Sequence, residues 1–167
     1  MSAAGSETVG QAVLKDTIAQ QRATISELQT PVIQVWQGIL ALPIVGTVDT
    51  ARAQDMTEAL LERIVATGSE IVLLDITGVP VVDTAVARHL LETVAAARLL
   101  GADVLIVGLS SRTAMTLVQL GIDLSHVTTR ATLAKGLEFA FRRLGLEVVE
   151  QNGSARRTVN TGDGAMP

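Results

Sequence analysis

The spacing of apolar residues predicts an amphipathic helix at the start of the chain. From about residue 7 to residue 29, Leu14, Ile18, Ile25 and Leu28 recur at alternating steps of four and three positions, with Gln21 interrupting the series. Such spacing keeps one apolar seam on one face of a helix. A helix of about two heptads is marginal alone, so we expect it to pair with a second copy of itself. The alternative is that the helix folds back on its own domain.

After Pro31 the pattern changes to short apolar runs that alternate with amphipathic helices. Residues 32–36 and 39–45 flank Gln37-Gly38, and this arrangement predicts a β-hairpin. The first helix that follows has Thr50 as its expected N-cap. The predicted helices span residues 51–66, 84–100, 112–120 and 131–144, and the predicted strands span residues 71–76, 104–107 and 126–128. Strand–helix alternation favours an α/β domain with a mainly parallel sheet, an antiparallel N-terminal edge hairpin and about four covering helices.

The chain therefore divides into three parts. Residues 1–30 are predicted to form an N-terminal linker helix that pairs as a dimeric coiled coil, and residues 31–147 form the α/β domain. Residues 148–167 are small and polar, which predicts a disordered tail.

Composition excludes several classes of protein. The 167 residues have no cysteine, no apolar run near the length of a membrane span and no signal-peptide pattern, so a cytoplasmic protein without disulfides is expected. A net charge of −4 and an aromatic content of 2% argue against nucleic-acid binding. The two histidines, His89 and His126, are far apart, and neither has a second histidine at ligand spacing, so no metal or cofactor is expected.

Polar side chains gather after the strand at residues 71–76, in Asp75-Ile76-Thr77-Gly78 and then Asp83-Thr84. Two carboxylates can perform acid–base chemistry, but a strand-end Asp75 more often satisfies backbone donors, and Asp83 is placed to cap the next helix. The phosphate-binding and nucleophile-elbow glycine motifs are missing from the sequence. Residues 108–111 offer a possible anion-binding loop, although Ser110 or Ser111 is more simply a helix cap. An enzyme is not expected.

The start of the helix near Thr84 is the most informative position. A hydroxyl there is exposed and rigidly supported, and it faces the positive end of the helix dipole. Phosphorylation would add a charge of about −2 beside Asp83 and would change any partner surface that packs there.

Several segments together resemble the STAS domain, named for sulfate transporters and anti-sigma factor antagonists. They are ITGVPVVDTAVARHL at 76–90, ARLLGA at 97–102, VGL at 107–109, LVQLGIDL at 117–124 and TLAKGL at 132–137. The likeness covers about residues 30–144, and the subtype resembles the stressosome scaffold proteins of the RsbR type. The combination of the Asp-Ile-Thr-Gly-Val-Pro block with Gly-Ile-Asp-Leu is specific, whereas neither alone would be.

The resemblance implies a non-enzymatic scaffold that assembles with itself and with paralogues and sequesters a serine/threonine switch kinase. On phosphorylation the kinase would leave and activate an output such as an alternative sigma factor. The family's first phosphoacceptor falls on Thr84, and the second falls on Thr116, with Thr113 one turn earlier as an alternative. The residues implied in the surrounding partner surface are Asp75, Thr77, Gly78, Asp83 and Arg88. The simpler roles are a helix cap for Thr84, a bond to a preceding carbonyl for Thr116 and a turn-stabilising hydroxyl for Thr77.

The chain departs from this pattern because RsbR-type proteins usually carry an N-terminal sensory domain before the linker helix. About thirty residues precede the first predicted strand here, and they fit only the linker.

Two other functions stay open on the sequence. One is a stand-alone antagonist that binds an anti-sigma kinase directly through the Thr84 surface, and the other is a ligand-binding module that uses residues 108–111.

Overall fold

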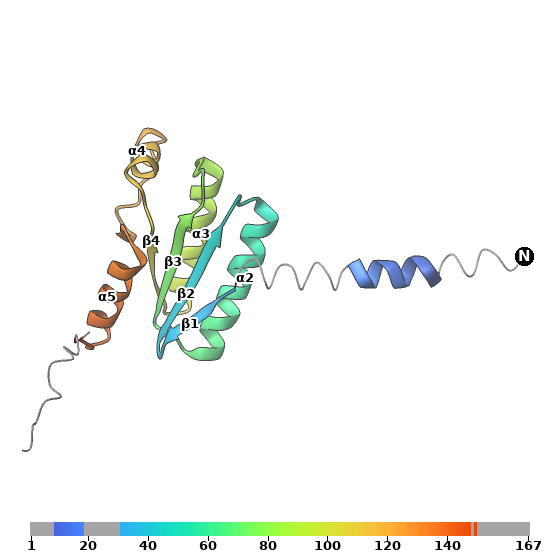
Figure 1. Ribbon diagram of the computed structural model, residues 1–167, viewed down its shortest axis with the longest axis horizontal. Helices are drawn as coiled ribbons and strands as arrows, with labels where there is room; N and C mark the ends of the chain where they lie inside the picture. Colours follow the sequence, from blue (N-terminus) through green and yellow to red (C-terminus); the bar gives the residue numbers. More distant parts are fainter. Residues whose placement is uncertain (1–8, 19–30, 148, 150–167) are drawn as a thin grey trace, which may run out of the picture.

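The computed structural model describes residues 9–18, 31–147 and 149. Residues 9–18 form a helix, and the remaining elements form a domain in which strands and helices alternate (Figure 1). In chain order these elements are β1 (Ile33–Trp36), β2 (Ile39–Val45), α2 (Thr50–Thr67), β3 (Ile71–Gly78), α3 (Thr84–Leu99), β4 (Asp103–Val107), α4 (Ser111–Gln119), β5 (Thr128–Arg130) and α5 (Leu133–Arg143).

The strands form one five-stranded sheet in the order β1-β2-β3-β4-β5. β1 and β2 are antiparallel and are joined through Gly38, whose φ of 88° lies in the left-handed region that favours glycine. The other neighbouring pairs are parallel, with Leu73 aligned to Ala41 on β2 and to Leu105 on β4. The predicted mainly parallel sheet with an antiparallel edge hairpin is confirmed.

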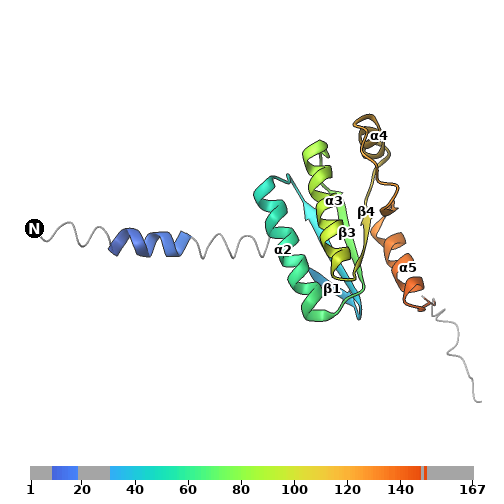
Figure 2. The same ribbon diagram turned by 180° about the vertical axis from the view of Figure 1, so that it is seen from behind.

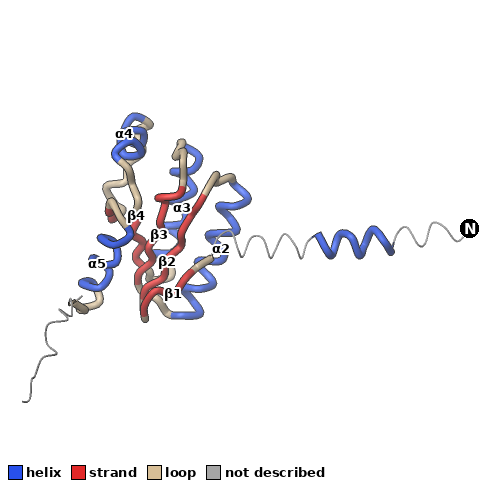
Figure 3. Tube along the Cα trace, in the orientation of Figure 1, coloured by secondary structure: helices blue, strands red, loops and turns tan. Residues whose placement is uncertain are grey.

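The sheet separates two apolar cores of unequal size. α2 and α3 cover one face, where Met56, Leu60 and Leu90 pack on Leu40 and Leu74. α5 packs on the other face, and Figures 1 and 2 show it on the opposite side of the sheet from α2 and α3. The tube in Figure 3 shows the strands as a central layer between these helices. Both faces of the central strands are therefore buried, which explains their uninterrupted apolar runs.

α5 approaches the sheet closely at a glycine. A Cβ added to Gly136 would lie 2.5 Å from Cγ1 of Val107 and 3.4 Å from Cδ2 of Leu73. Because real side chains do not approach so closely, a larger residue at this position would push α5 away from β3 and β4. The glycine thus sets how near α5 lies to the smaller core.

Each helix of the domain begins after a short polar side chain that accepts a backbone N–H of the first turn. The N-caps are Asp49 for α2, Asp83 for α3, Ser110 for α4 and Thr132 for α5. The prediction that Thr50 caps α2 is wrong, because the Asp49 Oδ1 accepts the N–H of Arg52 at 2.7 Å and Thr50 is already helical. Both residues suit a cap, and sequence alone does not separate two adjacent candidates.

The last strand begins two residues later than residues 126–128, the range predicted from the sequence. The turn after α4 extends further than expected, since the N–H of Val127 donates to the carbonyl of Leu124 at 2.9 Å. Within this turn Asp123 Oδ1 accepts the N–H of Ser125 at 2.8 Å. The hydroxyl and N–H of Ser125 also hold the pKa of the Asp123 carboxyl below its usual value. Asp123 in the Gly-Ile-Asp-Leu segment is therefore a turn residue.

The predicted linker helix is described only in part. Leu14 is 61% exposed and Ile18 is 42% exposed, and Val9 and Val13 on the same segment are exposed as well. Ile25 and Leu28, the other members of the predicted seam, lie outside the described residues, as does nearly all of the tail predicted for residues 148–167. Within the described ranges, no helix has both the length and the apolar character needed to cross a membrane.

Candidate functional site

The polar residues singled out by the sequence lie at the carboxyl ends of the parallel strands. At the end of β3, the Asp75 Oδ1 accepts the backbone N–H of Thr77 at 2.9 Å and the hydroxyl of Thr77 at 2.5 Å. Asp75 is half-buried, and its carboxylate closes a local turn around Thr77. Both residues therefore shape the strand end, and the Thr77 hydroxyl is occupied.

Two glycines let neighbouring loops approach this strand end. The carbonyl of Gly78 accepts the N–H of Gly46 at 2.9 Å, and a Cβ on Gly78 would meet the carbonyl oxygen of Ile44 at 3.1 Å. Gly108, at the end of β4, has a φ of 83°, and a Cβ there would lie 2.6 Å from the backbone nitrogen of Thr77. The start of the loop after β4 is thus pressed against the end of β3. This contact was not predicted, because the Gly-Leu segment reads only as the end of a strand.

Thr84 lies at the first position of α3 and does not cap it. The Asp83 Oδ1 accepts the N–H of Val86 at 2.8 Å and serves as the N-cap. Thr84 is exposed, and its hydroxyl makes no hydrogen bond with any residue that the structure describes. The simpler interpretation of Thr84 as a helix cap is thereby removed, and its hydroxyl is available for chemistry.

Arg88 lies one turn after Thr84 on the same face of α3. Its side chain is exposed and forms no ion pair or hydrogen bond within the described ranges. A guanidinium four residues after a hydroxyl is close enough to approach a phosphate attached to that hydroxyl. The two residues make this end of α3 suited to carry a charged modification.

Removal of the α3 cap tests how the Thr84 position is held. We expect Asp83→Ala to lower the free energy of unfolding by about 1 kcal/mol, because the N–H of Val86 loses its acceptor. Urea unfolding followed by circular dichroism measures this change. Asp49→Ala, which removes the equivalent cap of α2, is the matched comparison. An Asp83→Ala protein as stable as the unmodified chain would show that the cap does not hold the start of α3.

The second candidate hydroxyls lie on α4 and are less accessible. The hydroxyl of Thr116 donates to the carbonyl of Arg112 at 2.9 Å, and the hydroxyl of Thr113 lies 2.9 Å from the hydroxyl of Ser110. Both threonines are half-buried. They line a shallow hollow of about 330 Å³ that separates α4 from the segment at residues 79–82, and Arg112 borders it. The geometry does not choose between Thr113 and Thr116.

Two backbone donors at or near the loop at residues 108–111 already have partners. The N–H of Gly108 donates to the carbonyl of Arg130 at 3.2 Å, and the N–H of Thr113 donates to the Ser110 hydroxyl at 3.0 Å. These donors would have to be released before they could serve a ligand. Ser110 is a helix cap, as the simpler interpretation of this loop supposed.

The histidines take part in local contacts. His89 Nε2 lies 3.3 Å from the Thr50 hydroxyl, and His89 Nδ1 lies 3.7 Å from a carboxylate oxygen of Glu92. The backbone carbonyl of His126 accepts a hydrogen bond from Arg98. Across residues 9–18, 31–147 and 149, no three histidine or carboxylate side chains converge as metal ligands.

The sheet order, the strand-end turn at Asp75 and the capped helix with Thr84 at its start define a STAS domain. The family matches residues 30–136, and the chain belongs to it. The predicted fold and the resemblance seen in the sequence are both confirmed.

Comparison with individual proteins shows which members of the family this chain resembles. The chain is 45% identical over 133 residues to the RsbT co-antagonist protein RsbRA of Bacillus subtilis, and the match covers 80% of this chain and 48% of that protein. Among solved structures, it is similar to a serine-to-glutamate variant of Moorella thermoacetica RsbS, with 30% identity, a TM-score of 0.60 and coverage of 70% of this chain and 97% of the other. A chain from a structure of the stressosome, described as its molecular architecture, is 29% identical, with a TM-score of 0.56. The match covers 69% of this chain and 98% of that chain. The chain spans about half the length of the curated co-antagonist that it matches.

Proposed function

We propose that this chain is a non-enzymatic, phosphorylatable scaffold of a bacterial stress-signalling complex of the stressosome type. It holds a serine/threonine switch kinase and releases it when phosphorylated, so that the kinase acts on an alternative sigma factor pathway or a similar output. The observation that carries the proposal is the exposed hydroxyl of Thr84 on a capped helix, which makes no hydrogen bond to any residue in the described ranges. The similarity to a protein named as a co-antagonist of RsbT and to a chain from a stressosome structure supports it.

The local chemistry explains how one phosphate would remodel this surface. The Asp83 carboxylate already accepts the hydrogen bond of the Val86 N–H and places a negative charge next to Thr84. A phosphate on Thr84 would bring a further charge of about −2 to that point, and Arg88 one turn later is the nearest cation along the helix. The surface would change from nearly neutral to strongly acidic while the core beneath α3 stays unchanged. A partner docked over Thr84 would then be repelled without any change of fold.

Thr116 is the proposed second acceptor, and Thr113 is its alternative. The Thr116 hydroxyl is bonded to the carbonyl of Arg112 within α4, so a kinase reaches it less readily than it reaches Thr84. We therefore expect modification at Thr84 to be the faster of the two.

A direct experiment is to mix the purified chain with a serine/threonine switch kinase and ATP, and to map the modified residues by mass spectrometry. The proposal expects phosphate mainly on Thr84, with α4 modified more slowly. Phosphate found mainly elsewhere, or no transfer at all, would overturn it. Size-exclusion chromatography of the kinase complex before and after phosphorylation tests whether the modification releases the bound kinase.

A stand-alone antagonist is the second candidate. Its basis is that the match to this chain covers 97% of the solved RsbS chain, so a protein of this fold need carry no further domain. Particle mass separates the two functions. A megadalton-scale assembly with paralogues supports the scaffold, whereas a monomer or dimer under all conditions supports the antagonist.

The proposed coiled-coil linker gives a separate expectation. Leu14→Asp combined with Ile18→Asp should weaken dimerisation about tenfold or more, because like charges would enter an apolar seam. Analytical ultracentrifugation of the full chain measures the dissociation constant. Ala12→Asp, on the opposite face of the same helix, is the control and should leave self-association unchanged. A dissociation constant unaffected by the seam substitutions would exclude pairing through this helix.

A further inference from the structure

The aromatic residues of the chain lie on the α5 side of the sheet, with Trp36 and Phe141 toward the β1 edge and Phe139 toward the β5 edge. The sequence contains one tryptophan and two phenylalanines, and Trp36 on β1 meets Phe141 on α5 edge to face with 5.6 Å between the ring centroids. Phe139 packs under the guanidinium of Arg130 on the same side. Trp36 remains 52% exposed although it is the largest apolar side chain present. Exposed tryptophan, phenylalanine and arginine are the residues enriched in protein–protein interfaces.

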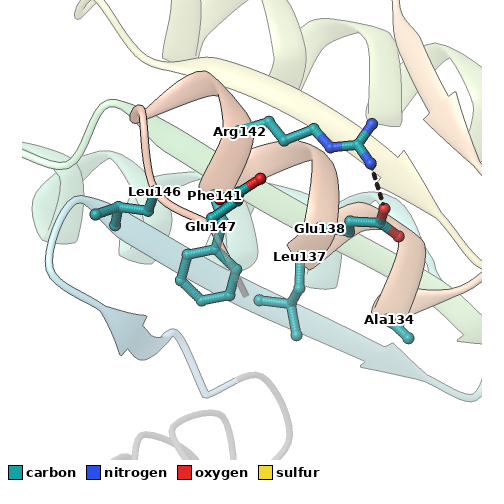
Figure 4. A pocket seen from close by; sticks show the side chains of 7 residues that line it. All are labelled: Ala134, Leu137, Glu138, Phe141, Arg142, Leu146 and Glu147. Atoms are coloured by element: carbon teal, nitrogen blue, oxygen red, sulfur yellow. Dashed lines mark hydrogen bonds and ion pairs between the residues drawn. The ribbon is translucent and has the colours of Figure 1, made fainter. Parts of the chain in front are cut away.

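A groove of about 550 Å³ runs along α5, and Phe141 is one of the residues that line it. Leu137 and Phe141, one turn apart on α5, and Leu146 beyond its end form its apolar lining, and Figure 4 shows them around the groove. The groove exists because helices cover the two faces of the sheet unequally. α2 and α3 cover one face of the sheet, whereas α5 alone of the described helices packs on the other. The apolar lining next to β1 therefore stays open.

The charges along the groove indicate which partner would fit it. Glu138 and Arg142 are paired at 2.7 Å across one turn of α5, and both side chains are mostly exposed. If two copies of α5 pack antiparallel about a twofold axis that passes between these positions, Glu138 of each copy faces Arg142 of the other. An apolar stripe flanked by opposite charges one turn apart is thus complementary to itself.

We propose that the groove lined by Leu137, Phe141 and Leu146 is an interface between two copies of this chain, in which the α5 helices pack antiparallel. Glu138 of each copy exchanges its intrahelical partner for Arg142 of the second copy, and Trp36 becomes buried at the rim. Because the exchanged ion pairs stay near the surface, they select the partner and the apolar lining provides the affinity.

This interface goes beyond the phosphorylation proposed for Thr84 and is independent of it. α5 lies on the opposite face of the sheet from α3, so one face serves assembly while the other presents the modified hydroxyl. A scaffold that self-associates through α5 keeps its phosphoacceptor surface free. Failure of the interface would leave the kinase experiment on Thr84 unaffected, and failure of that experiment would leave the interface standing.

Charge reversal in two separate full-length chains tests the proposal. Glu138→Arg places arginines at positions 138 and 142, and Arg142→Glu places glutamates at both. In each variant alone the antiparallel dimer sets like charges against one another, whereas a mixture restores two opposite pairs. We expect tagged E138R to capture untagged R142E with about a tenfold preference over untagged E138R, because each dimer contains two such pairs.

The design separates this interface from pairing of the N-terminal helices and from effects on folding. N-terminal pairing would capture both untagged variants equally, and mixing cannot restore a bond within one helix. Circular dichroism confirms that each variant is folded, and the emission of Trp36, the single tryptophan, should shift to the blue only in the complementary mixture. Glu62→Arg mixed with Arg63→Glu, an exposed pair on α2, is the matched control and should show no preference. Equal capture of both untagged variants, or no capture of either, would overturn the proposal.

Discussion

Replacing Thr84 with alanine is expected to reduce kinase-dependent phosphorylation of the main site to background. The Thr84 hydroxyl makes no hydrogen bond within the described part of the chain, and Asp83 caps the helix without it. Loss of the hydroxyl should therefore leave stability within about 0.5 kcal/mol of the unmodified chain, as is usual for exposed positions. Phosphopeptide mapping measures the first effect and urea unfolding the second.

Matched variants make this result specific to the hydroxyl. Thr84→Ser keeps an oxygen at the same position and should retain phosphorylation, whereas Thr84→Val keeps the shape and should not. A Thr84→Ala protein that still carries its main phosphate would remove the proposed site. Thr84→Asp is a weaker mimic, because one carboxylate supplies less charge and fewer acceptor oxygens than a phosphate.

Gly108→Ala is expected to destabilise the fold by about 3 kcal/mol. The φ of 83° at this position disfavours any side chain, and the new Cβ would lie 2.6 Å from the backbone nitrogen of Thr77 and 2.9 Å from Oδ1 of Asp75. The turn that Asp75 forms with Thr77 would have to move, and with it the loop leading to Thr84. Urea unfolding measures the loss.

Gly101→Ala separates the two causes of that loss. Gly101 has a φ of 85°, but nothing lies within 4 Å of a Cβ added there. It should therefore cost only about 1 kcal/mol for the left-handed backbone. Equal losses for the two variants would show that the close approach of Gly108 to the end of β3 contributes nothing to the loss of stability.

The sequence predicted the architecture well because burial on both faces of the sheet leaves a strong pattern. The apolar run at residues 71–76 matched β3, and the helix predicted for residues 51–66 matched α2 to within one residue at each end. Boundaries were less predictable where two polar residues competed, as for Asp49 and Thr50, or where a turn extended beyond its motif, as after Asp123. In both places hydrogen bonds between near neighbours decide the outcome, and hydrophobic spacing carries no information about them.

The sequence indicated where the residues of the candidate site lie along the chain but not which of them contact one another. Asp75 and Thr77 bond to each other, Asp83 caps α3, and Thr84 makes no hydrogen bond within the described residues. The approach of Gly108 to Thr77 joins segments about thirty residues apart. The groove beside α5 depends on which face of the sheet each helix covers. Neither feature leaves a local signature in the chain.

The two proposed acceptor hydroxyls stand on helices that are anchored very differently. α3 contributes five buried side chains to the larger core, among them Val86, Leu90 and Val94, whereas α4 contributes only Leu117. Local opening of α4 therefore exposes little apolar area, whereas local opening of α3 exposes much of the larger core. The Thr116 hydroxyl, bonded to the carbonyl of Arg112 within α4, is released when that helix opens. The proposed site on α3 thus stands on the stable part of the fold, and the proposed site on α4 stands on a part that opens at a lower cost in free energy.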